Sequence, residues 1–255
     1  MLHHLPPTIE DPPPEPAYRE AAPPADLAQV VACLWTRHGG DGDSPTTRVV
    51  PDGCADLMWI TDGGTARLVV AGPDTHAHLS TLGPDGAIAG LRFAPGAAAD
   101  VLGVPLDTVR DARPDLTDLW GRSDVEAVAE AAAASAQPEQ ALAAAVARRS
   151  VDRPDWAMRR VAAELAASHH PAPVRGLAAE LGLSERQLHR RCAAAFGYGP
   201  KTLHRVLRFQ SALALARAGR DLAWVAHECG YADQPHLARD VADLAGVSLT
   251  ALLDR

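Results

Sequence analysis

The spacing of apolar residues near the C-terminus predicts two short helices. In residues 174–197, VRGLAAELGLSERQLHRRCAAAFG, Leu177 and Leu181 lie four positions apart and therefore on one helix face. Gly182 follows, and we expect the first helix to end there because glycine enters the left-handed region without a steric cost. A second helix should begin just beyond this turn.

Polar residues mark the start and the outer face of the second helix. Ser184 and Gln187 fit the S-x-x-Q capping box, in which each side chain bonds the backbone of the other residue. Arg186, His189 and Arg190 would face outward. Two helices joined by a glycine turn, with arginines on the second, are typical of a helix-turn-helix that places its second helix in the DNA major groove.

The same pattern recurs further along the chain. Residues 222–246 repeat the apolar spacing and the glycine turn, with Gly230 matching Gly182. Between the two, residues 200–218 show a continuous helical pattern that would span about 28 Å. The sequence therefore predicts two helix-turn-helix units joined by a long helix, a spacing that suits successive major grooves roughly 34 Å apart.

Short apolar runs bounded by turn residues predict strands in the N-terminal half. TTRVV (46–50), ADLMWI (55–60), ARLVVAG (66–72) and GAIAGLRFAPG (86–96) follow this pattern, whereas AQVVACLW (28–35) fits a strand or a short helix. Such strands predict a small β-barrel or curled sheet whose interior can hold a ligand. The predicted fold class is therefore α+β, with an N-terminal sheet and helices followed by an all-α double helix-turn-helix domain.

Changes of pattern place the expected domain boundaries. Prolines crowd the first 24 residues and disfavour a packed element there. Alanine-rich helical segments follow residue 122, and their spacing fits a helical hairpin that acts as a dimer seam or as a plain linker. The expected divisions are a Pro-rich flexible arm at 1–24, a β-rich sensor-like domain at 25–121, a helical hairpin or linker at 122–153, and the double helix-turn-helix domain at 154–255.

Charge is distributed unevenly between these parts. The net charge of −8 argues against nucleic-acid binding if the chain is taken whole. Residues 154–255, however, hold 13 Lys and Arg against 10 Asp and Glu, while the remainder holds 11 against 22. We therefore expect modest electrostatic affinity for DNA in the C-terminal part. No apolar run is long enough for a membrane span, and four scattered cysteines suit reduced thiols of a cytoplasmic protein.

Several motifs point to a known family. They are A-x-x-x-G-Y-x-x-x-x-x-L-x-R from Ala226 to Arg239, the A-G-V-S at 245–248, and the stretches GLSERQLHRR and GYGPKTLHRVLRFQ. With these motifs the last hundred residues resemble the AraC-type transcriptional regulators. PDGCADLMW and LRFAPGAA are similar to a sensor-like domain that precedes such units. The resemblance implies a bacterial regulator of double-stranded DNA, often a homodimer, with a small-molecule effector and, for an activator, RNA polymerase as partners.

The resemblance also assigns DNA contacts by motif position. They are Ser184, Arg186, Gln187, His189, Arg190, Lys201, Gln234, His236 and Arg239. Arginine can bind guanine O6 and N7, glutamine can bind adenine, and a serine at a helix N-terminus can hold a phosphate. The family usually carries further basic residues after the last arginine, whereas this chain has Asp240 and Asp243. We therefore expect the first unit to dominate base recognition.

Four residues of the N-terminal half are candidate ligand contacts. Cys54 follows a Pro-Asp-Gly turn at the mouth of a strand, where its thiol could line a pocket with Trp35, Trp59 and Phe93. The thiol could instead sense oxidants or electrophiles. The alternative to both is a small buried residue, since free cysteine is among the most buried residue types.

Enzymatic functions find little support in the sequence. It lacks G-x-S-x-G, a phosphate-binding glycine loop and H-E-x-x-H. Some AraC-type proteins carry a methyl-accepting DNA-repair domain with four clustered cysteines, but here Cys192 and Cys229 lie in the helix-turn-helix units. We expect no catalytic residue, metal or cofactor. Two alternatives stay open: a protein-interaction module without DNA specificity and, with less support, that cysteine-based repair regulator.

Overall fold

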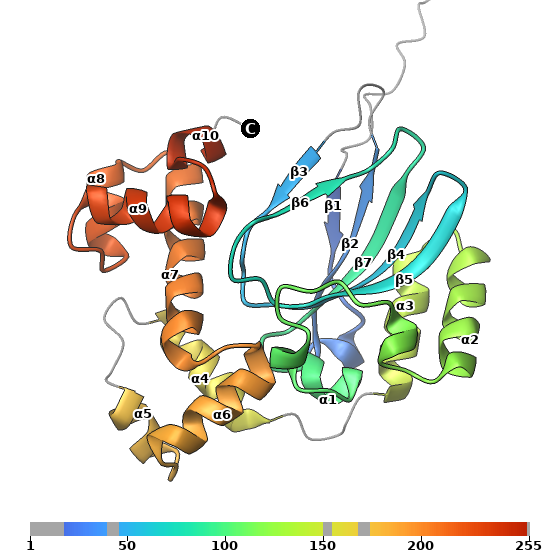
Figure 1. The fold of residues 1–255 in the computed structure, drawn as a ribbon, viewed down its shortest axis with the longest axis horizontal. Helices are drawn as coiled ribbons and strands as arrows, with labels where there is room; N and C mark the ends of the chain where they lie inside the picture. The colour runs from blue at the N-terminus through green and yellow to red at the C-terminus, as the bar shows by residue number, and fades with distance from the viewer. Residues whose placement is uncertain (1–17, 40–45, 150–154, 168–173, 254–255) are drawn as a thin grey trace, which may run out of the picture.

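The computed structural model describes residues 18–39, 46–149, 155–167 and 174–253. Figure 1 shows a sheet-containing N-terminal part beside a helical C-terminal part. The observed architecture confirms the predicted α+β class. None of the described helices is long and apolar enough to span a membrane.

Five antiparallel strands form the main sheet, in the order β1-β2-β7-β4-β5. They are β1 (Tyr18–Ala21), β2 (Val31–His38), β7 (Ala87–Phe93), β4 (Asp56–Asp62) and β5 (Thr65–Ala71). A separate antiparallel pair, β3 (Thr46–Val49) and β6 (His78–Thr81), lies beside the main sheet (Figure 1). The edge strands β1 and β5 do not pair with each other, so the sheet is curled, as one alternative predicted, and is not a closed barrel. The ambiguous segment at 28–35 contributes to β2.

Successive residues of each main strand point to opposite faces of the sheet. In β4, Leu57 and Trp59 belong to the larger core of the N-terminal part, whereas Met58 and Ile60 belong to a small cluster on the other face. In β7, Phe93 lies on the first face and Ile88 on the second. One face therefore packs against helices, and the other is free to line a cavity.

A helical hairpin, α2 (Arg122–Ala133) and α3 (Pro138–Arg149), packs against the first face of the sheet (Figure 1). Leu142 and Val146 of α3 are fully buried in the same core as Trp59 and Phe93. The apolar stripe of the hairpin expected at 122–153 therefore faces the sheet, and the role of this hairpin as a dimer seam or a linker stays a prediction.

The first strand alters the expected N-terminal arm. Tyr18–Ala21, which the proline-rich composition had placed in the arm at 1–24, pairs with β2 as its edge strand, with Tyr18 opposite Arg37. The backbone of β2 offers an open row of hydrogen-bonding groups, and β1 fills it. Residues 1–17 of that arm lie outside the described residues.

Short helical elements complete the N-terminal part. They are the 3₁₀ turns η1 (Ala25–Leu27), η2 (Leu106–Thr108) and η3 (Leu116–Asp118), and the helix α1 (Ala98–Leu102).

Helices alone make up the described residues beyond 155. They are α4 (Trp156–Ala167), α5 (Val174–Glu180), α6 (Glu185–Phe196), α7 (Pro200–Arg217), α8 (Leu222–Glu228), α9 (Gln234–Ala245) and α10 (Leu249–Leu253). A continuous buried cluster from Ala157 to Leu252 holds them together. At 18 residues, α7 is about 27 Å long and separates the two helix pairs.

The predicted internal repeat is confirmed by the backbone. We call α5 with α6 the first unit and α8 with α9 the second unit. Gly182 and Gly230 stop the first helix of each unit with φ of 66° and 70°. Gly197 and Gly246 end the second helix of each unit, again at positive φ. Such angles favour glycine, so the repeat depends on these four positions.

Candidate nucleic-acid interface and internal cavity

The N-terminus of α6 is built by its own side chains. Ser184 Oγ accepts a hydrogen bond from the Gln187 backbone N–H at 3.3 Å, and Gln187 Oε1 accepts from the Ser184 N–H at 2.8 Å. The capping box read from the sequence is therefore formed. Because this cap occupies the Gln187 oxygen, only the amide nitrogen of Gln187 remains free to contact a base.

The outer face of α6 carries free positive charge. Arg186, His189 and Arg190 are exposed, while Leu188 is fully buried on the opposite side. Neither Arg186 nor Arg190 forms an ion pair with any described residue. Arg191, on the flank of the helix, instead pairs with Asp155 at 2.6 Å. The first unit thus presents two unpaired guanidinium groups one turn apart.

A shallow groove joins α6 to the start of α7. It has a volume of about 340 Å³, and its lining includes Arg186, His189, Gly199 and Lys201. The His189 ring lies against Gly199, where a Cβ would approach Nε2 to 2.4 Å. The groove therefore places Lys201 beside the predicted DNA contacts of α6. Glycine is needed at position 199 because a Cβ there would collide with the His189 ring.

The second unit presents fewer free groups. The Asp233 side chain accepts from the His236 backbone N–H at 2.6 Å and caps α9. His236 Nδ1 in turn accepts from the Ala232 N–H at 3.2 Å, and its ring meets Tyr231 edge-on. Gln234 is exposed, and so is Arg239, which pairs with no described acidic residue. His236 is thus committed to local structure more than the sequence suggested.

Asp240 corrects an expectation drawn from the sequence. The sequence predicts an acidic residue beside Arg239 that weakens the contact of the second unit with DNA, but the Asp240 side chain is buried between α7 and α9. Its carboxylate accepts hydrogen bonds from Arg205 Nε at 2.5 Å, Arg208 Nη2 at 3.1 Å and the Tyr231 hydroxyl at 3.0 Å. Burial alone would raise the pKa of Asp240, but these bonds and charges outweigh burial and lower the pKa. Asp240 is therefore a clamp between two helices.

Asp243 lies on the same helix one turn further on. Its exposed carboxylate pairs with Arg205 Nη2 at 3.1 Å. Neither acid therefore offers an uncompensated negative charge beside Arg239.

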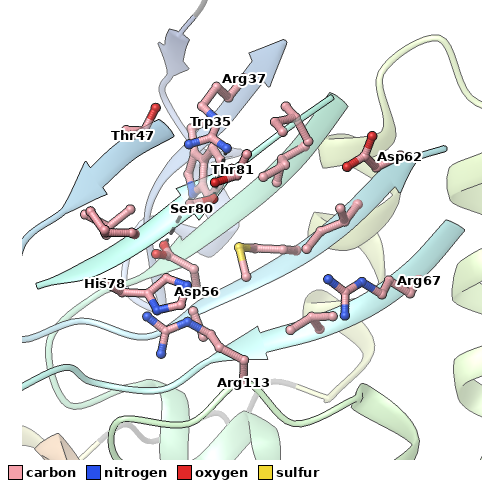
Figure 2. Close-up of a pocket in the computed structure, with 18 of the residues that line it drawn as sticks. Trp35, Arg37, Thr47, Asp56, Asp62, Arg67, His78, Ser80, Thr81 and Arg113 are labelled. Atoms are coloured by element: carbon pink, nitrogen blue, oxygen red, sulfur yellow. Dashed lines mark hydrogen bonds between the residues drawn. The ribbon is translucent and has the colours of Figure 1, made fainter. Parts of the chain in front are cut away.

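A cavity of about 750 Å³ lies in the N-terminal part, between the second face of the main sheet and the β3–β6 pair. Figure 2 shows side chains from both sheets pointing into it. The main sheet contributes apolar and charged residues in similar number, and β3 and β6 contribute mostly polar ones. The contributing residues include Trp35, Met58, Ile60, Val69 and Ile88 from the main sheet and Thr47, His78, Ser80 and Thr81 from the pair.

Three arginines in the lining differ in how they are neutralised. Arg92 Nε lies 3.1 Å from Asp56 and 3.3 Å from Asp52, and Arg113 donates two bonds to Asp74. Arg37 is only 8% exposed, yet its one partner in the described structure is the Ser80 hydroxyl, at 2.9 Å. Burial lowers the pKa of Arg37, with no carboxylate to offset it. Arg37 is thus a buried cation without a counter-charge.

The predicted ligand contacts fall on different sides of the sheet. Trp35 lines the cavity, and its indole N–H donates to Asp56 at 3.3 Å. Trp59 and Phe93 lie on the opposite face, in the helix-packed core. Strand alternation explains the difference, because Trp59 is one residue away from Met58, which does line the cavity. Arg37 is not among the ligand contacts predicted from the sequence, although it is two residues from Trp35 on the same strand and so shares its face.

Cys54 lies outside the cavity lining, in the turn before β4. It is half-buried, and its N–H donates to Asp52 at 2.9 Å. Burial, together with the nearby Asp52 and Asp56 carboxylates, raises the pKa of the Cys54 thiol well above its usual value. The reactive thiolate is therefore scarce at neutral pH, which weakens the redox-sensor hypothesis.

The β3–β6 pair also touches the second unit. Arg48 of β3 donates to the Ala245 carbonyl at 2.9 Å, and the Ala77 N–H, just before β6, donates to the Leu244 carbonyl at 2.7 Å. Both carbonyls belong to the last turn of α9. The walls of the cavity and the end of α9 are therefore linked directly. Nearby, the Gln210 amide of α7 donates to the Pro51 carbonyl at 2.5 Å, which accounts for a polar residue on that helix face.

Two protein families match the chain. Residues 177–255 match a family described as a helix-turn-helix domain, and residues 19–115 match one described as a domain of unknown function (DUF6597). No curated protein sequence matches.

Several solved structures are remotely similar. ToxT from Vibrio cholerae O395 has 10% identity and a TM-score of 0.47, over 93% of this chain and 97% of that one. Unsaturated fatty acid bound ToxT from Vibrio cholerae strain SCE256 has 12% identity and a TM-score of 0.44, over 88% and 94%. A probable AraC family transcriptional regulator from Rhodopseudomonas palustris CGA009 has 28% identity and a TM-score of 0.35, over 39% and 95%.

Proposed function

We propose that this protein, whose residues 177–255 form an AraC-type helix-turn-helix domain, is a DNA-binding transcriptional regulator controlled by an effector in its N-terminal part. One observation carries the proposal: α6 presents Arg186 and Arg190 exposed, beside Lys201, and neither arginine pairs with an acidic residue in the described part of the chain. Free guanidinium groups on the outer face of such a helix suit bidentate contacts to guanine and contacts to phosphate.

The two units would bind successive major grooves on one side of the DNA. The α7 helix joins the two units, and its length of about 27 Å is of the same order as one helical turn of B-DNA, roughly 34 Å. In this arrangement α6 supplies most base contacts, and α9 contributes through Gln234 and Arg239. Ser184 donates both its N–H and its hydroxyl to Gln187 Oε1, so the backbone N–H groups of Glu185 and Arg186 in the first turn of α6 would hold a phosphate instead.

Electrophoretic mobility shift with DNA from upstream of the protein's own gene tests this function. Sequence-selective binding that weakens steeply with salt is expected, because phosphate contacts release counterions. Absence of selective binding, with or without added small molecules, would favour the interaction-module alternative.

Replacing Arg190 with alanine should relax the preference at a single base position. The loss of one bidentate contact there is expected to cost about 1–3 kcal/mol. A binding-site selection carried out with the wild type and the Arg190→Ala variant measures it. Arg122→Ala, on the exposed side of α2, is the matched control. If the base preference of Arg190→Ala equals that of the wild type, Arg190 does not contact a base.

Effector control would pass through the β3–β6 pair. This pair forms one wall of the cavity, and through Arg48 and Ala77 it holds the last turn of α9. A ligand that moves the wall therefore also shifts the restraint on α9. A ligand can bias DNA binding only through such a difference between two states.

The Arg48→Ala variant tests this link. Without the bond to the Ala245 carbonyl, α9 is freer to adjust to DNA, and we expect affinity in the absence of effector to rise about threefold to tenfold, as the loss of one such bond allows. Fluorescence anisotropy with labelled operator DNA measures the change. Equal affinity of Arg48→Ala and wild type would show that the contact does not restrain DNA binding.

A further inference from the structure

We propose that the cavity binds a ligand with one carboxylate on an apolar body, and that Arg37 is the group that anchors the carboxylate. The inference rests on the proposed effector function and names the chemistry of the effector.

Arg37 is the first argument for an anionic ligand. Its side chain is more than nine-tenths buried and lines the cavity. A guanidinium has five N–H donors, but here it donates to the Ser80 hydroxyl alone within the described structure. A buried charge that lacks a counter-charge is costly. A bound carboxylate would remove that cost and can accept two parallel bonds from the guanidinium.

The charge balance of the cavity limits the ligand to one negative charge. Arg92 faces two carboxylates, those of Asp52 and Asp56, and Arg113 pairs with Asp74. Asp62, also in the lining, adds a carboxylate that pairs with no described cation, so the lining has no cation to spare for a second negative charge on the ligand. Arg67 is exposed, so water screens its charge. Arg37 is therefore the one buried cation of the described lining that remains uncompensated. A dianionic phosphate would leave a second negative charge without a partner.

The walls of the cavity determine the rest of the ligand. Beyond the polar groups around Arg37, the small buried cluster of Trp35, Met58, Val69 and Ile88 gives the cavity an apolar wall. Figure 2 places Arg37 near Ser80 and Thr81 at one end of the cavity, and Arg113 at the other. A volume of about 750 Å³ lies within the range of small-molecule sites, roughly 300–1,000 Å³. An apolar body would therefore fill the cavity while its carboxylate meets Arg37.

Matched probes separate charge from shape in the full-length protein. Calorimetry would compare 2-naphthoate, its neutral counterpart 2-naphthalenemethanol, the phosphate monoester 2-naphthyl phosphate, and the linear decanoate. We expect at least one carboxylate to bind roughly thirtyfold more tightly than the alcohol, and more tightly than the phosphate. If naphthoate binds more tightly than decanoate, the ligand has an aromatic body, and if decanoate binds more tightly, the ligand has a linear one. Either result supports the proposal.

Variants at two arginines identify the anchor. Arg37→Gln should lose about thirtyfold in carboxylate affinity. Arg67→Gln, on the edge strand β5 at the exposed side of the same cavity, should change it less than about threefold. Without ligand, Arg37→Gln should melt no lower than wild type, because it removes an uncompensated buried charge. Carboxylate should raise the melting temperature of wild type and not of Arg37→Gln.

Three results would overturn the proposal. They are carboxylate binding that survives Arg37→Gln, equal or tighter binding of the alcohol or the phosphate, and no binding of either carboxylate to wild type at roughly millimolar concentration. An electrophoretic mobility shift assay on the same samples distinguishes failure of the ligand proposal from failure of the DNA-binding proposal. If DNA binding persists while the carboxylates fail, the ligand chemistry is wrong and the DNA-binding function stands. If selective DNA binding is absent, the proposed function fails whatever the cavity binds.

Discussion

Replacing Asp240 with asparagine should lower the free energy of unfolding of the C-terminal part by about 3 kcal/mol, the cost of removing one partner from a buried ion pair. The carboxylate of Asp240 is 7% exposed and accepts bonds from Arg205, Arg208 and Tyr231. An asparagine would remove the negative charge that pairs with Arg208. Its amide N–H would also face the donor groups that now bond the carboxylate, and two donors cannot form a hydrogen bond with each other. Urea denaturation followed by circular dichroism measures the loss.

Asp243→Asn is the matched control, since its exposed carboxylate makes one ion pair with the same Arg205. It should cost less than about 0.5 kcal/mol, as exposed pairs do. Similar losses for the two variants would show that Asp240 is not a buried clamp.

The pH dependence of stability gives a second measure of the Asp240 clamp. Because the pKa of Asp240 is lowered in the folded protein, its contribution is present above the pKa of an unfolded aspartate, about 3.9, and is lost as the pH falls through the folded value. Wild type should therefore lose stability more steeply than Asp240→Asn below about pH 4. Parallel acid profiles for the two proteins would contradict the lowered pKa.

The double replacement of Arg186 and Arg190 with alanine should reduce affinity for operator DNA by roughly a thousandfold. Each arginine is exposed and free of acidic partners in the described structure, and each bidentate contact to guanine is worth about 1–3 kcal/mol. Both side chains lie outside the core that Leu188 anchors, so the fold should persist. Fluorescence anisotropy with labelled operator measures the affinity, and circular dichroism checks the fold.

The equivalent double variant in the second unit, Gln234→Ala with Arg239→Ala, is the comparison. We expect it to lose less than about thirtyfold, because among the described residues α9 has one arginine without an acidic partner where α6 has two, and His236 is engaged locally. A larger loss for the second unit would reverse the order of the two recognition helices.

Sequence patterns predicted the helix-turn-helix units well because their determinants are local. Gly182 and Gly230 end their helices by adopting a positive φ just after the last apolar position, and Ser184 with Gln187 forms a cap within four residues. The helices follow from these signals without reference to distant parts of the fold.

The cavity was harder to predict, because its lining depends on which face of each strand meets which neighbour. Trp59 and Met58 are both large and apolar, and only pairing with β5 and β7, with α3 behind the sheet, decides that Met58 faces the cavity. The two acidic residues of α9 illustrate the same limit. Asp240 and Asp243 look alike in sequence, yet one is buried against α7 and the other is exposed.

The β3–β6 pair has a consequence for pharmacology. The β3–β6 strands line the cavity and also bond the last turn of α9. The affinity of a ligand for the cavity and its effect on DNA binding would therefore depend on different parts of the ligand. A compound that satisfies Arg37 but leaves these strands in place would occupy the site without altering transcription, and it would block a larger compound that displaces them. Agonists and antagonists of the same regulator would then share a carboxylate and differ only in the bulk directed toward β3 and β6.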